Sequence, residues 1–66
     1  MNTMKKVQLQ MVGLDGNAFS IMGAFQRQAR REGWTKEEIG TVLDKARSGD
    51  YYNLINVIAE HCENPA

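Results

Sequence analysis

Residues 34–39 read Trp-Thr-Lys-Glu-Glu-Ile and contain the clearest structural pattern in the chain. Thr35 and Glu38 have the spacing of a capping box, in which each side chain accepts a hydrogen bond from the backbone N–H of the other residue. Trp34 precedes the cap and Ile39 lies one turn beyond it, which is the spacing of a hydrophobic staple. The stretch therefore predicts that a helix begins directly after Thr35.

The segment before this cap has the pattern of another helix. Asn17 is a favourable residue for capping its start, and Gly33 is a natural residue for ending it. Between them, apolar residues recur at helical spacing and form one stripe: Ala18, Ile21, Met22, Phe25 and Ala29. We therefore predict a helix over residues 17–32.

Two more apolar stripes follow the capping box. The first belongs to the helix that begins after Thr35 and consists of Ile39, Val42, Leu43 and Ala46. Gly49 ends that helix and Asp50 caps a third, whose stripe consists of Tyr51, Leu54, Ile55, Ile58 and Cys62. Pro65 then closes the chain, because proline cannot readily extend a helix.

One β-strand is predicted ahead of the helices. Within residues 6–12, Val7, Leu9 and Met11 alternate with polar residues, as in a half-buried strand. We expect no second strand in the chain, and a lone strand would leave its backbone groups unpaired. We therefore expect these three residues to form the interface of a homodimer, or of a larger oligomer with an even number of copies. A disordered N-terminal segment is the alternative.

The predicted fold is thus α+β and mostly helical, with one N-terminal strand followed by three short helices. We expect a single domain over residues 1–66, with a flexible start (1–5) and a C-terminal tail (64–66). A chain of 66 residues has a small core and is marginally stable alone. Its single cysteine excludes an internal disulfide, and its single histidine leaves no ligand set for a structural zinc. Self-association is the remaining route to extra stability.

Charge and hydropathy exclude several classes of function. Eight Lys and Arg balance eight Asp and Glu, which argues against a protein that coats nucleic acid or an anionic membrane. No apolar run approaches the roughly 20 residues of a membrane span, and the first residues lack the apolar core of a signal peptide. We therefore expect a cytoplasmic protein with no membrane partner.

Catalytic patterns are missing from the sequence. His61 and Cys62 are adjacent and would point in different directions from a helix. Asp15 and Asp50 stand at helix entries, where turn formation and capping explain them. We expect no enzymatic activity, no cofactor and no metal site.

The outward side of the first helix is a candidate binding face. Gly23 is costly inside a helix, by about 1 kcal/mol relative to alanine, which suggests that another molecule approaches it closely. The residues that project opposite the apolar stripe are Ser20, Gly23, Ala24, Arg27 and Arg31, with Arg30 beside them. An anionic ligand or an acidic helix of a partner would suit these arginines. A plain solvated surface is the alternative.

Two aromatic residues, Phe19 and Tyr52, lie off the main stripes of their helices. Exposed aromatic side chains favour binding surfaces, although in a small chain they also occur in oligomer interfaces. The candidate residues for binding a ligand or partner are Ser20, Gly23, Arg27, Arg30, Arg31 and Tyr52. The third helix carries no Lys or Arg, so we do not expect it to contact DNA or RNA.

Three short segments resemble a group of known sequences. Residues 15–19 read Asp-Gly-Asn-Ala-Phe, residues 21–23 read Ile-Met-Gly, and residues 49–51 read Gly-Asp-Tyr. On these segments, and over about residues 7–58, the chain resembles small uncharacterised proteins of bacteriophages, prophages and bacterial mobile elements. The resemblance carries no known activity and no site residues. It implies a short accessory gene, whose product often binds and blocks a host component such as a defence system.

The sequence therefore predicts a small oligomeric binding protein. It would act in the host cytoplasm as an inhibitor or sequestering protein for a host factor or a small anionic ligand. The alternative is a small nucleic-acid-associated regulator that uses Arg27, Arg30 and Arg31.

Overall fold

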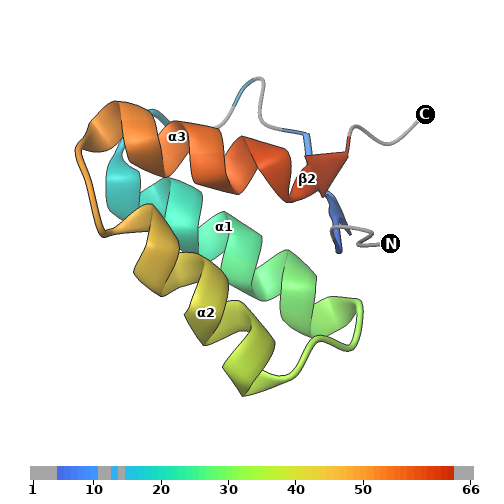
Figure 1. Cartoon of the computed structure of the whole chain (residues 1–66). Coiled ribbons are helices and arrows are strands. Elements are labelled where there is room, and N and C mark those ends of the chain that lie inside the picture. The colour runs from blue at the N-terminus through green and yellow to red at the C-terminus, as the bar shows by residue number, and fades with distance from the viewer. Residues whose placement is uncertain (1–4, 11–12, 14, 64–66) are drawn as a thin grey trace.

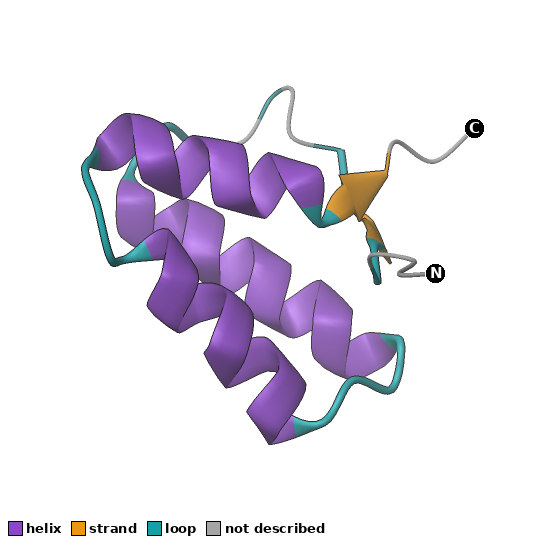
Figure 2. Ribbon diagram, viewed as in Figure 1, coloured by secondary structure: helices purple, strands orange, loops and turns teal. Residues whose placement is uncertain are grey.

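Three α-helices follow a short β-strand in the computed structural model, which describes residues 5–10, 13 and 15–63. The elements in chain order are β1 (Val7–Gln8), α1 (Ala18–Arg31), α2 (Lys36–Ala46), α3 (Tyr51–Glu60) and β2 (Cys62–Glu63). The three helices pack together, and both strands lie at the end of the bundle where α3 finishes (Figures 1 and 2). The predicted fold class, α+β and mostly helical, is confirmed.

Each helix begins at the capping residue that the sequence predicts. Asn17 caps α1 and Asp50 caps α3, each by accepting a hydrogen bond from a backbone N–H of the first turn. At α2, Glu38 N donates to Thr35 Oγ1 at 3.1 Å and Thr35 N donates to Glu38 Oε1 at 2.8 Å, which completes the capping box. These contacts satisfy N–H groups that have no partner inside a helix.

The C-terminal end of α1 is closed by a Schellman motif. Gly33 adopts a positive φ of 90°, which a residue with a Cβ atom rarely adopts. Its N–H donates to Arg30 O, and the N–H of Trp34 donates to Ala29 O, both at 3.0 Å. Trp34 and Ala29 are both buried, in keeping with the apolar pair that frequently accompanies this motif. The predicted stop at Gly33 is confirmed.

The core forms where the three apolar stripes meet. Phe25 and Ile58 are completely buried, and the rings of Phe25 and Trp34 meet edge to face with centroids 5.4 Å apart. Two predictions about individual residues are wrong. Ala24 is buried although it was placed on the outward side of its helix, and Tyr51, expected in the core, is 46% exposed. Val57, which the predicted stripes omit, also belongs to the core.

The prediction that the chain holds no second strand is also wrong. β1 pairs in parallel with β2, with Val7 opposite Cys62 and Gln8 opposite Glu63. Val7 N donates to His61 O at 2.8 Å. Cys62, expected on the third helix, therefore lies in a strand, because α3 ends at Glu60. Two residues are too few to show the alternation by which a strand is identified in a sequence.

The other edge of β1 is covered by a side chain. The N–H of Gln8 points away from β2 and donates to Glu32 Oε2 at 2.7 Å. A dimer through this strand was expected because its backbone N–H groups would otherwise lack partners. The N–H groups of Val7, Gln8 and Leu9 instead donate to His61 O, Glu32 Oε2 and Glu63 O of the same chain. Three residues were predicted to form the oligomer interface. Val7 is completely buried in the chain's own core, and the partly buried Leu9 packs against that core. Met11 lies outside the described residues.

The start of the described chain is held against α2. Lys5 was expected in the flexible N-terminal segment, but its Nζ lies 2.8 Å from Glu38 Oε2 and 5.2 Å from the centre of the Trp34 ring. The backbone carbonyl of Lys5 also lies 3.0 Å from His61 Nδ1. Residues 1–4 and 64–66, the rest of the predicted flexible ends, lie outside the described residues.

Candidate functional site

A groove of about 460 Å³ runs along the outward side of α1, and we call it the arginine groove. It is lined by Leu9, Ala24, Arg27, Gln28 and Arg31. Four of these residues come from the middle and the C-terminal end of α1, and Leu9 comes from the segment that follows β1. The groove therefore combines a basic wall with a partly apolar floor.

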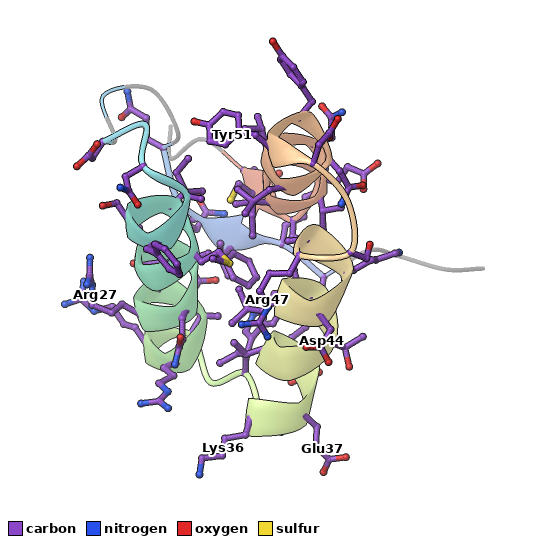
Figure 3. All side chains as sticks on the ribbon, turned by 90° about the vertical axis from the view of Figure 1, so that its left-hand side faces the viewer. Arg27, Lys36, Glu37, Asp44, Arg47 and Tyr51 are labelled. Carbon is purple, nitrogen blue, oxygen red and sulfur yellow. The ribbon has the colours of Figure 1, made fainter. Side chains whose placement is uncertain are left out.

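The two arginines of this groove are available to a ligand. Arg27 and Arg31 lie one helical turn apart, so their side chains leave the same face of α1. Both are exposed, and Arg27 extends away from the helical bundle (Figure 3). The ion pairs among the described residues are Lys5–Glu38 and Asp44–Arg47, so no described carboxylate lies within 4.0 Å of either groove arginine.

Leu9 and Ala24 form the apolar floor. Leu9 was predicted to lie in an oligomer interface, whereas Ala24 was predicted on the same outward face as the two arginines. The backbone N–H of Leu9 donates to Glu63 O at 3.2 Å, which ties Leu9 to β2. Leu9 lines the same groove as Ala24, and this is why that side of α1 is less open than helical periodicity predicts.

The remaining predicted site residues on α1 do not join the arginine groove. Ser20 Oγ donates to Asp15 Oδ2 at 3.4 Å, near the N-terminal end of the helix. Gly23 is half-buried, and a Cβ atom built on it would meet only Arg27 Nη1, at 4.0 Å. No described part of the chain therefore approaches Gly23 closely enough to require a glycine there.

Arg30 lies on a different side of α1 from Arg27 and Arg31. It borders a second groove, of about 270 Å³, between α1 and α2. Lys36 lines the same groove from the first turn of α2. The predicted basic face is thus divided: Arg27 and Arg31 border the arginine groove, and Arg30 borders the neighbouring groove with Lys36, which the prediction did not include.

A third groove, of about 310 Å³, lies where the N-terminal ends of α1 and α3 approach each other. Phe19 and Tyr51 line it, and Tyr52 stands beside Tyr51 with the ring centres 6.4 Å apart. We call these three residues the aromatic patch. Phe19 is 81% and Tyr52 77% exposed, as their positions off the helical stripes predicted. Tyr51 was expected in the core, and its hydroxyl instead donates to Gly16 O.

The residues with nucleophilic or acid–base chemistry have structural roles. Burial, followed by the nearby charge of Glu32, raises the pKa of Cys62 to about 11, so its thiol is protonated and unreactive at neutral pH. The His61 ring meets Phe25 and Trp34 edge-on at the end of the core. Asp15 Oδ1 accepts a hydrogen bond from Asn17 N, which is a turn contact of the kind that the sequence predicted.

The described part of the chain shows neither a metal site nor a membrane span. Within residues 5–10, 13 and 15–63, no three His, Cys, Asp or Glu side chains are grouped so as to hold a metal ion. None of the helices in the same residues combines the length and the apolar character needed to cross a bilayer.

Comparison of the chain with protein-family models, curated protein sequences and solved structures finds no match. The resemblance to small phage and mobile-element proteins therefore stays a prediction. Any assignment of function rests on the chemistry of the grooves described above.

Proposed function

We propose that this protein is a binding protein without catalytic activity, and that its arginine groove holds the anionic group of a small organic ligand. The observation that carries the proposal is the pair Arg27 and Arg31. Both side chains border one groove of about 460 Å³, and no described carboxylate neutralises them.

The chemistry of two guanidinium groups favours a phosphate or a carboxylate as the ligand's charged group. Each guanidinium offers five N–H donors in a planar fork that matches two oxygens of such an anion. Residues four apart on a helix have Cβ atoms about 6 Å apart, so both forks can reach a single phosphate. Charge-assisted hydrogen bonds of this kind are roughly twice as strong as neutral ones.

The floor of the groove favours a ligand that also has an apolar part. Leu9 and Ala24 present carbon atoms next to the two arginines. Gln28 completes the lining, and its Nε2 donates to Glu32 Oε2 at 2.8 Å, which leaves its carbonyl oxygen to accept a bond from a ligand. A small alkyl phosphate or alkyl carboxylate satisfies both halves of the site.

The groove lies toward the C-terminal end of α1, where the helix dipole is negative and does not attract anions. Binding therefore depends on the arginine side chains themselves. Replacing either arginine should greatly weaken the affinity for the anion. The free backbone groups at the C-terminal end of a helix are carbonyls, which cannot donate hydrogen bonds in place of an arginine.

The experiment is a thermal-denaturation titration with inorganic phosphate, butyl phosphate and butyrate. A ligand present at 100 times its Kd stabilises the folded state by about 2.7 kcal/mol. We expect butyl phosphate to stabilise the wild-type protein more than inorganic phosphate does. Arg27→Gln and Arg31→Gln should lose this stabilisation, whereas Arg30→Gln, on another side of the same helix, should retain it. No stabilisation of the wild-type protein, or an equal loss in Arg30→Gln, would refute the proposal.

A nucleic-acid-associated regulator is the second candidate, because Arg30 and Lys36 extend the cationic surface into the neighbouring groove. Such a protein would contact successive phosphates with all four cations, and its affinity would fall steeply with salt. Titration of a duplex oligonucleotide at two salt concentrations separates the candidates. Equal losses of duplex affinity in Arg30→Gln and Arg27→Gln would favour the regulator.

In the setting that the sequence resemblance implies, the small ligand of our first proposal would be sequestered from the host.

A further inference from the structure

The aromatic patch contains all the large hydrophobic side chains that are exposed in the described part of the chain. Phe19 and Tyr52, which are 81% and 77% exposed, project from the same end of the bundle. Large exposed apolar patches bordered by polar groups mark interaction sites, and aromatic residues are enriched among those that carry binding energy.

The patch contains both a projection and a recess that could receive it. The floor of the 310 Å³ groove is formed by Met22, Ala46 and Leu54, all of which are buried apolar residues of the core. Phe19 stands on its α1 side, and Gly49 lines it from the turn between α2 and α3. The groove can thus accept an aromatic ring without a change in the core.

One wall of the recess is held in place before any partner arrives. The Tyr51 side chain points toward the loop that precedes α1, and its hydroxyl donates to Gly16 O (Figure 3). The Tyr51 and Tyr52 rings pack edge to face, with an interplanar angle of 76°. A wall that is already ordered loses little conformational entropy when a partner binds.

The charges on the rim suit a second copy of the same chain. Arg47 and Asp50 both line the groove, and Arg47 is also paired with Asp44 at 3.0 Å. The rim therefore carries both signs of charge, and the whole chain has a formal net charge of zero. Two identical surfaces that were mainly basic or mainly acidic would repel each other, and this one would not.

We infer that this chain forms a two-fold dimer in which Phe19 of each copy inserts into the groove of the other. A two-fold interface brings the same surface of both copies together, so one surface must supply both the projection and the recess. The aromatic patch meets this condition, whereas β1 does not, because its edges are occupied by β2 and Glu32. The inference does not depend on the proposed ligand of the arginine groove.

The experiment measures the mass of the protein by sedimentation equilibrium from low-micromolar to millimolar concentration. The wild-type protein should approach twice the chain mass of 7.4 kDa. Phe19→Glu should remain at the chain mass, because a carboxylate would replace the inserted ring. The variant should stay folded by circular dichroism, since an acidic residue at the second position of α1 complements the helix dipole. Tyr52→Ser, a second exposed position, should weaken the dimer about tenfold or more.

Glu37→Gln is the matched control, because Glu37 lies at the opposite end of the bundle from Tyr51 (Figure 3). It should dimerise as the wild-type protein does, and so should Arg27→Gln, whose loss of ligand binding would leave the mass unchanged. High salt should not dissociate the dimer, because its contacts are mainly apolar. A wild-type protein that is monomeric at every concentration would overturn the inference and point to a different partner. A dimer that survives in both Phe19→Glu and Tyr52→Ser would overturn it as well.

Discussion

Replacing Glu32 with alanine tests how the short β-sheet is attached to the helices. Glu32 follows α1, and its carboxylate Oε2 accepts hydrogen bonds from Gln8 N at 2.7 Å and from Gln28 Nε2 at 2.8 Å. The first of these bonds joins the outer edge of β1 to the end of α1. The Glu32→Ala variant removes both hydrogen bonds and leaves the N–H of Gln8 open to solvent.

The expected loss of stability follows from these two bonds. A hydrogen bond to a charged group contributes about 1.5–3 kcal/mol when it is protected from water, and less at this exposed site. Against this, a carboxylate at the C-terminal end of a helix is unfavourable by about 0.3–1 kcal/mol, and alanine removes that cost. We therefore expect a net loss of about 1 kcal/mol in the free energy of unfolding. For a domain of this size, that corresponds to a decrease in Tm of about 4–8 °C.

Thermal denaturation followed by circular dichroism measures this effect. The control is Glu60→Ala, since Glu60 is also an exposed carboxylate at the C-terminal end of a helix and shows no ion pair within the described residues. Glu32→Gln should fall between the two variants, because an amide oxygen in the place of Oε2 can accept both bonds but carries no charge. The uncovered edge of β1 should also make Glu32→Ala more prone to associate. If Glu32→Ala and Glu60→Ala have the same Tm, the Glu32 carboxylate does not fasten the strand and our account of the sheet is wrong.

Two further predictions concern the turn before α3 and the start of α2. Gly49→Ala should destabilise the fold by about 1–2 kcal/mol, because its Cβ would lie 2.9 Å from Asn53 Cβ. Urea denaturation measures this loss, and unchanged stability would contradict the expected clash with Asn53. The hydrogen bonds from Lys5 and from the Thr35 backbone lower the pKa of Glu38 below its ordinary value of 4.5. Folding thus favours the ionised carboxylate, so its contribution to stability is present above pH 4.5 and is lost as the pH falls below that value. Glu38→Gln should lose less stability than the wild-type protein over this acidic range, and parallel pH profiles would contradict the assignment.

The helix boundaries could be predicted because the interactions that set them are local. A capping box joins residues three apart, and the Schellman motif after α1 joins residues within six positions of each other. Thr35, Glu38 and Gly33 therefore act within their own segments, whatever the rest of the chain does. The apolar stripes are also local patterns, and they correctly identified most of the core.

The sheet and the environments of single residues depend on contacts between distant parts of the chain. β1 pairs with β2 across more than 50 positions, and neither two-residue strand has enough length to be recognised from its own pattern. The same limit explains the wrong prediction for Tyr51, whose hydroxyl is drawn outward by the carbonyl of Gly16. It also explains Ala24, which lines a groove with Leu9 that a helical projection cannot reveal.

The candidate sites divide in the same way. Helical periodicity alone placed Arg27 and Arg31 on one outward face, and it also identified Phe19 and Tyr52 as exposed. Only the tertiary structure decided that Arg30 faces a different groove, that Leu9 completes the floor beneath the two arginines, and that Phe19 stands beside a recess. Periodicity specifies the direction in which a side chain leaves its own helix, whereas the packing of the elements decides what lies next to it.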